Sequence, residues 1–258
     1  MNNVILFVFE GKRIETGLLK SIQNLFFGEK PIIYAIFGAE IYQLWEEIAG
    51  DPDLDLVDLL RERDVNQLQG IRSSDISEVH LFFDHDSHAN FASPQNQNAI
   101  AHMIDWFDNE TGNGKLYLSY PMAEAIKDCK RDLNECFECE AYISANIHYK
   151  ELVNSRSDFR SVKDYSRDDW IFLIAVTILK ASRLVFGTYG SRNYQEFMGV
   201  DQQAIFVKQL ELFIRPRRSV VILGAIPFFI IGYFGKDLYD ELRLPDISKH
   251  CSFFCISP

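Results

Sequence analysis

The sequence predicts an α/β protein whose first half forms a mainly parallel sheet covered by helices. Short apolar runs alternate with amphipathic helical segments up to about residue 130. Two of the runs, Val4–Phe9 and Val79–Phe83, are apolar at nearly every position, which is typical of strands buried on both faces. The later segments are mostly helical, so the prediction is completed by a mainly helical C-terminal region.

The elements of the first half follow from apolar spacing and from the residues that interrupt it. The helix predicted over Glu15–Phe27 has an apolar stripe of Leu18, Leu19, Ile22, Leu25 and Phe26. Gly38 and Gly50 close the strand and the helix that follow, and Pro121 is a residue favoured in a helix's first turn. In order, the elements are strand Val4–Phe9, helix Glu15–Phe27, strand Pro31–Phe37, helix Ala39–Ile48, helix Leu54–Arg63, strand Val79–Phe83, helix Gln95–Asp108, strand Lys115–Tyr120 and a helix from Pro121.

Helices dominate the second half of the chain. Ser166 and Asp169 resemble a capping box at the start of a helix that runs to Gly187. We expect one domain over residues 1–137 and a helical region over residues 138–258 that dimerises or docks a partner. Further helical segments are predicted at Gln202–Phe213 and at Val220–Leu242, the latter broken near Pro227.

The composition narrows the class of protein. A formal net charge of -11 argues against a protein that coats nucleic acid nonspecifically, although an enzyme can still hold nucleic acid through a local basic patch and a metal. Glu10, Lys12 and Arg13 follow only a short apolar run, unlike a signal peptide, so we expect a cytoplasmic protein. The stretch Val220–Phe234 falls short of the roughly 20 residues of a membrane span, so we expect buried core and no membrane association.

The five cysteines allow two interpretations. Their odd number fits a reducing compartment. Cys136 and Cys139, together with Cys251 and Cys255, could form a four-thiolate zinc site. Because the two pairs are far apart in the chain and neither lies in a Gly-rich knuckle, we expect buried or incidental thiols instead.

Carboxylates follow two of the predicted strands directly. Val4–Phe9 runs into Glu10, and Val79–Phe83 runs into Asp84 and Asp86. If the strands are parallel neighbours, these acids meet at their carboxyl ends, where open α/β sheets bind their ligands. Three carboxylates held close together repel one another and need a cation, and an all-oxygen set suits Mg²⁺ or Mn²⁺. The sequence therefore predicts a metal site on a phosphoryl-transfer scaffold.

An apolar strand followed by Glu10-Gly11, and a later apolar strand followed by Asp84-His85-Asp86, resemble the Toprim domain of topoisomerases, primases and several nucleases. The resemblance covers about residues 1–130 and implies a Toprim catalytic domain within residues 1–137. The segment Glu10–Glu15 is most similar to the glutamate motif of bacterial anti-phage defence nucleases. These include the overcoming-lysogenization-defect (OLD) and RloB-like groups and the Toprim effector of the PARIS system.

The resemblance implies metal-dependent phosphodiester cleavage. Glu10, Asp84 and Asp86 would hold Mg²⁺ (or Mn²⁺), and Glu15 and Glu124 are candidates for a second ion. A surface acid in a first helical turn is an equal alternative for these last two. The resemblance also implies a catalytic lysine, for which Lys12 and Lys150 are the candidates. His88 is a candidate substrate contact, and His85 is left unassigned.

The expected function is that of a nuclease that cleaves RNA, possibly tRNA, or DNA as the toxic effector of an anti-phage system. The chain has no phosphate-binding Gly-x-x-x-x-Gly-Lys loop, so a controlling ABC- or SMC-type ATPase would be a separate subunit, and we also expect a homo-oligomer. The arginine cluster Arg215, Arg217 and Arg218 would cap a helix or meet an acidic partner. The alternatives are a non-catalytic binding subunit of an ATPase complex and a haloacid-dehalogenase-like phosphatase with Asp84 as nucleophile. The phosphatase scheme places its acid pair on the first strand, not the third.

Overall fold

The chain divides into two compact units. The first comprises residues 1–123 together with 162–164, and the second comprises residues 124–161 and 165–258. The boundary expected from the sequence lies after residue 137, whereas the division between the two units lies between residues 123 and 124. The computed structural model describes residues 4–11, 14–51, 54–63, 68–85, 94–132, 140–142, 148–188, 193–242 and 244.

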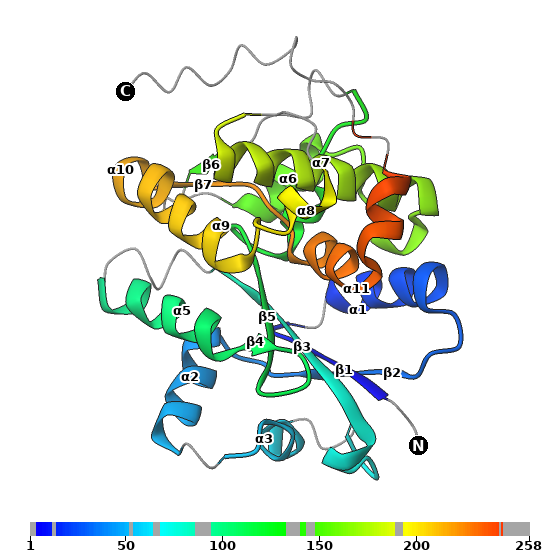
Figure 1. The fold of residues 1–258 in the computed structure, drawn as a ribbon, viewed down its shortest axis with the longest axis vertical. Helices are drawn as coiled ribbons and strands as arrows, with labels where there is room; N and C mark the ends of the chain where they lie inside the picture. Colours follow the sequence, from blue (N-terminus) through cyan, green and yellow to red (C-terminus); the bar gives the residue numbers. More distant parts are fainter. Residues whose placement is uncertain are drawn as a thin grey trace. The chain divides into compact units, whose positions relative to one another are not determined.

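A five-stranded sheet forms the centre of the first unit (Figure 1). Its order is β2-β1-β3-β5-β4, and every neighbouring pair is parallel except β4 and β5. Every residue of β1 is buried, as expected for a central strand covered on both faces. The prediction of an α/β fold with a mainly parallel sheet is confirmed. The strands are β1 (Val4–Phe9), β2 (Ile32–Ile36), β3 (Ile76–Asp84), β4 (Asp108–Asn109) and β5 (Gly114–Ser119).

Helices cover both faces of this sheet. Right-handed crossovers place α1, between β1 and β2, on one face and the helices after β2 and β3 on the other, as Figure 1 shows. The α1 stripe continues through a π-helical turn, Gln23–Phe27, so that Phe27 rather than the predicted Phe26 is buried. The helices are α1 (Glu15–Ile22), α2 (Ile41–Gly50), α3 (Leu56–Arg63) and α5 (Pro94–Trp106), with 3₁₀ turns at Ser73–Asp75 and Val162–Asp164.

Gly114 begins β5 in a conformation that only glycine adopts easily. Its φ is 103°, and a Cβ atom there would lie 2.5 Å from Cδ1 of Leu81. We expect Gly114→Ala to destabilise the protein by about 2–4 kcal/mol, because backbone strain and overpacking add. Gly112→Ala is the matched control, since its Cβ would meet nothing closer than 3.7 Å. Urea unfolding of the two variants checks this, and an equal loss of stability would contradict it.

The second unit is mainly helical, as predicted. The capping box is confirmed: the Asp169 N–H donates to Oγ of Ser166 (3.1 Å), and the Ser166 N–H donates to Oδ2 of Asp169 (2.9 Å). Trp170 in the same helix is fully buried. The elements are α6 (Tyr149–Arg156), α7 (Arg167–Phe186), α8 (Tyr194–Phe197), α9 (Gln202–Gln209) with a π-helical turn at Leu210–Ile214, α10 (Arg215–Arg217), α11 (Ala225–Glu241), a 3₁₀ turn at Ala123–Lys127, and the antiparallel strands β6 (Glu140–Tyr142) and β7 (Ser219–Val221).

The segment predicted as Val220–Leu242 differs from the prediction in two ways. Val220 and Val221 belong to β7, whose Val221 exchanges two hydrogen bonds with the buried side chain of Gln209. The break in α11 lies at Gly235 (φ 64°, ψ -145°) and not near Pro227, so that prediction is wrong. Pro227 lies in the first turn of α11, where a missing N–H breaks no helical bond.

Two further expectations concern membranes and thiols. Among the described residues, no helix is long and apolar enough to cross a membrane. Of the stretch predicted to be buried, Val220–Ile231 is buried, whereas Gly232 is exposed and Tyr233 and Phe234 are half-buried. Cys129 is buried, as expected, but it is disulfide-bonded, so the expectation of a thiol is wrong for this residue. The other four cysteines lie outside the described residues. Because disulfides persist mainly in oxidising compartments, the cytoplasmic location stays a prediction.

Candidate active site

Glu10 and Asp84 are neighbours at the carboxyl edge of the sheet. The backbone N–H of Asp84 donates to Oε2 of Glu10 (3.1 Å), and the Glu10 N–H donates to the carbonyl of Phe82 (3.2 Å). Both acids are half-buried; Glu10 follows the wholly apolar strand β1, and Asp84 follows the buried apolar residues Leu81–Phe83 of β3. The parallel pairing of β1 and β3 is what brings them together across 74 residues of sequence. The expected meeting of Glu10 and Asp84 is therefore present.

The same edge continues onto β5 through residues that the sequence analysis did not select. Asp84 pairs in register with Ser119, whose carbonyl accepts the N–H of His85 (2.8 Å). Ser119 is buried on β5, the neighbour of β3, which gives this edge a hydroxyl-bearing residue in register with Asp84. The position of Ser119 at the end of the strand predicted over 115–120 is the signal that would have found it.

His85 is a buried support of this edge. Its side chain is 3% exposed, and its ring stacks on Tyr120 with centroids 5.0 Å apart. Because side chains alternate along an extended chain, His85 points away from the side that Asp84 occupies. Burial raises the pKa of the Tyr120 phenol well above its usual value, so this ring stays neutral beneath the site. His85 therefore has a packing role that the sequence left unassigned.

Glu15 lies beside the first strand end. Its Oε2 accepts the N–H of Ile14 (3.0 Å), and its Oε1 lies 3.2 Å from the position that a Cβ on Gly11 would occupy. The missing side chain of Gly11 thus leaves room for this carboxylate next to the residue that follows Glu10. The predicted candidates Glu10, Glu15 and Asp84 therefore belong to one edge of the first unit.

Glu124 and Lys150 contact each other in the second unit. Nζ of Lys150 lies 3.5 Å from Oε1 of Glu124, whose Oε2 is buried without a hydrogen-bond partner. Lys150 remains largely exposed. These two predicted site residues therefore pair with one another, and the structure gives no placement of the pair relative to the first unit.

Three sequence-predicted residues lie outside the described part of the chain: Asp86, Lys12 and His88. Among the residues that the structure does describe, no group of three or more His, Cys, Asp or Glu side chains is arranged to hold a metal ion. The described donors that fit a hard divalent cation are the carboxylate oxygens of Glu10 and Asp84, with Glu15 beside them. Asp86, the third acid of the predicted set, lies outside the described residues.

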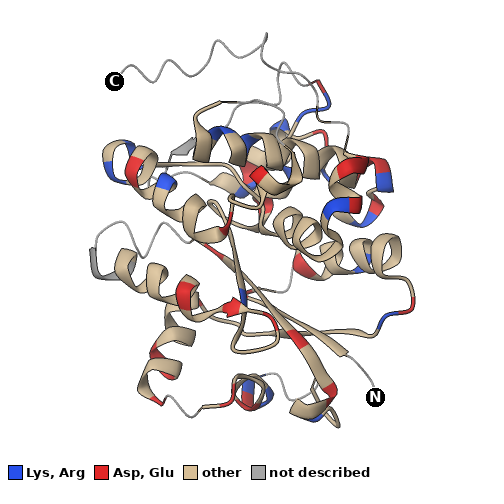
Figure 2. Cartoon of the chain, in the orientation of Figure 1, with Lys and Arg blue, Asp and Glu red and all other residues tan. Residues whose placement is uncertain are grey.

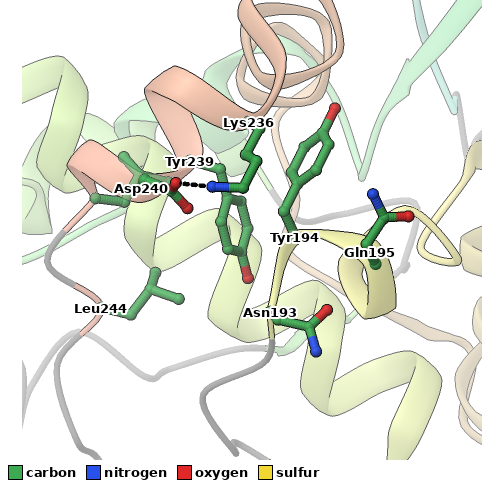
Figure 3. A pocket seen from close by; sticks show the side chains of 8 residues that line it. Asn193, Tyr194, Gln195, Lys236, Tyr239, Asp240 and Leu244 are labelled. Carbon is green, nitrogen blue, oxygen red and sulfur yellow. Dashed lines mark hydrogen bonds and ion pairs between the residues drawn. The ribbon is translucent and has the colours of Figure 1, made fainter.

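A pocket of about 570 Å³ lies in the second unit and contains none of the predicted acids. Figure 3 shows the side chains that line this pocket, among them Tyr194 and Tyr239. Lys236 and Asp240 also line it and form an ion pair. The charges of Lys236 and Asp240 offset each other. The ring centroids of Tyr194 and Tyr239 lie 5.5 Å apart. The pocket is thus a feature separate from the carboxylate edge. It is lined by Asn193, Tyr194, Gln195, Lys236, Tyr239, Asp240, Leu242 and Leu244.

Comparison with protein-family models, with curated proteins and with solved structures finds no match for this chain. The Toprim resemblance therefore stays a prediction that rests on the motifs at Glu10 and Asp84.

Proposed function

We propose that the chain is a divalent-metal-dependent nuclease whose site is the carboxyl edge of the five-stranded sheet. The observation that carries the proposal is the contact between Glu10 and Asp84. Two half-buried acids lie at the carboxyl ends of the adjacent parallel strands β1 and β3, and a cation offsets the repulsion between carboxylates held close together. Open parallel sheets bind their ligands at this edge.

Each residue has a role in the proposed reaction. Glu10, Asp84 and Asp86 would hold Mg²⁺ or Mn²⁺, and Glu15 would support or extend that set. When bound, such an ion neutralises charge on a phosphodiester and favours deprotonation of an attacking water. Glu10 in addition accepts the N–H of Asp84 and so fixes the two strand ends relative to each other. Lys12 and Lys150 stay the candidates for the cation that stabilises the leaving group.

The biological setting is also proposed. The Glu10–Glu15 motif is similar to that of anti-phage nucleases, so we place the chain as the toxic effector of a defence system in the cytoplasm. The substrate would be RNA, including tRNA, or DNA. The net charge of -11 disfavours an unaided grip on nucleic acid and suits control by a separate ATPase subunit. A homo-oligomer is also part of the proposal.

Cleavage by the purified protein tests this function. Supercoiled DNA and total RNA, tRNA included, are incubated with Mg²⁺ or with EDTA, with wild type, Asp84→Asn and the exposed control Glu62→Gln. The fragment ends are then sequenced. We expect cuts that EDTA and Asp84→Asn abolish and that Glu62→Gln retains. The same comparison is made in cells that also express the neighbouring genes. Cuts that survive in Asp84→Asn, or no cuts in either setting, would overturn the proposal.

A further inference from the structure

Two tryptophans lie side by side on the outer surface of the first unit. Trp45 of α2 and Trp106 of α5 meet edge to face, with ring centroids 6.4 Å apart. Trp106 is 40% exposed, and Trp45 is half-buried. Neither indole N–H donates a hydrogen bond to another described residue. A large aromatic surface with free donors is thus open to a partner, and tryptophan is enriched at the centres of interfaces.

Acids outnumber bases around this pair, and the two described bases nearby, Arg63 and Lys115, are paired with Glu47 and Glu110. Neither α2 nor α5 contains a lysine or an arginine. Glu46, Asp105 and Asp108 are neighbours of the tryptophans in the sequence, are exposed, and form no ion pair in the described part of the chain, although Asp108 pairs in strand register with Lys115. Figure 2 shows red segments and no blue ones on both helices. We name Trp45, Trp106, Glu46, Asp105 and Asp108 the tryptophan face.

We propose that the tryptophan face docks a lysine- and arginine-rich segment of another protein. A guanidinium or ammonium group over an indole ring is attracted by the ring's electron density, most strongly for tryptophan. The flanking carboxylates complement the remaining positive charges and speed association. Phosphates are repelled by the same carboxylates, so nucleic acid is not the occupant.

A second copy of this chain is a poorer occupant than a basic partner. Each copy carries a net charge of -11, so two copies repel each other. Within the chain's arginine cluster, the Arg217 guanidinium already lies over the ring of Phe213, 5.1 Å from its centroid. We therefore expect the positively charged groups that bind the tryptophan face to belong to a different protein.

The tryptophan face lies away from the carboxylate edge. Trp106 is the last residue of α5, and Phe107, which follows it, accepts a hydrogen bond from Leu116 near the start of β5 (2.9 Å). Asp84 and Ser119 mark the opposite ends of β3 and β5. Docking is therefore independent of cleavage, and the proposal can fail while the proposed function stands.

Binding of a fluorescein-labelled octa-arginine peptide, followed by fluorescence anisotropy in near-physiological salt, tests the proposal. Trp106→Ala leaves the charge unchanged, and we expect it to weaken binding by about tenfold. Leu152→Ala is the matched control, because Leu152 is an equally exposed apolar side chain (41%) in the second unit. Equal affinities of Trp106→Ala and wild type would overturn the proposal.

Charge variants give a second, independent arm that does not alter the packing of the tryptophans. Glu46→Gln with Asp105→Asn is compared with Glu151→Gln with Asp168→Asn, two exposed acids of the second unit. We expect the first pair to weaken octa-arginine binding by about fivefold and the second by less than about twofold. Equal losses would show nonspecific attraction and overturn the proposal. Self-association that Trp106→Ala abolishes would also overturn it, in favour of a second copy.

Discussion

Glu10→Gln should lower phosphodiester cleavage by about 10²–10⁴-fold without unfolding the protein. A carboxylate that helps hold a divalent ion contributes several kcal/mol of charge stabilisation in the transition state, and each 1.4 kcal/mol corresponds to about tenfold in rate. The amide oxygen of glutamine can still accept the N–H of Asp84, so the bond between the two strand ends survives. Cleavage rates at saturating substrate, with circular dichroism of the same samples, measure the effect.

The control and the stability of this variant sharpen the test. Glu29→Gln removes one exposed carboxylate from the same unit and should cleave like wild type. Without divalent ions, Glu10→Gln should be about as stable as wild type, because the amide oxygen still accepts the N–H of Asp84. An active Glu10→Gln enzyme would remove Glu10 from the proposed site.

Asp128→Ala should destabilise the second unit by about 3 kcal/mol, the largest stability loss that we predict for this unit. The Asp128 side chain is only 5% exposed, and it accepts hydrogen bonds from Nε (2.7 Å) and Nη2 (2.5 Å) of Arg156 and from the hydroxyl of Tyr149 (2.9 Å). Removing it takes away the carboxylate that pairs with this guanidinium, and breaking a buried pair typically costs about 3–5 kcal/mol. The partial exposure of Arg156 (24%) favours the lower end of that range.

Urea unfolding of Asp128→Ala beside Glu211→Ala measures this effect. Glu211 pairs with Lys208 in the same unit, but both side chains are well exposed (50% and 38%), and such pairs contribute about 0–1 kcal/mol. The difference between the variants isolates burial as the cause. If Asp128→Ala costs no more than Glu211→Ala, the buried network of Asp128, Tyr149 and Arg156 does not stabilise the unit as argued.

The first unit could be predicted well from the sequence because local signals and long-range packing agree there. Val4–Phe9 is apolar on both sides, and such a run is stable only in the centre of a covered sheet, which is where β1 lies. The spacing of Glu10 and Asp84 from their strands then fixes the edge at which both acids lie. The strand order, the short strand β4 and the burial of Phe27 in place of Phe26 depend on tertiary packing and were not predicted.

The larger errors lie in the second unit, because tertiary contacts decide its structure. Val220 and Val221 have strand propensity but lie in an apolar run long enough for a helix, and pairing with β6 decides the outcome. The break in α11 needs a residue with positive φ, and Gly235 adopts that conformation easily. Pro227 does not break the helix, because it lies in the first turn, where its missing N–H costs no helical hydrogen bond. The pairing of Glu124 with Lys150 also depends on how η3 (Ala123–Lys127) meets α6, which no motif records.

Binding of Mn²⁺ in the absence of substrate tests the central claim, the divalent-ion site at Glu10 and Asp84, most directly. Free Mn²⁺ is quantified by its paramagnetic resonance signal during titration of wild type, Glu10→Gln, Asp84→Asn and Glu29→Gln. We predict saturable binding by wild type and Glu29→Gln, and affinities at least about tenfold weaker for Glu10→Gln and Asp84→Asn. Equal Mn²⁺ affinity in all four proteins, or no saturable binding by wild type, would contradict the metal site and the nuclease built on it.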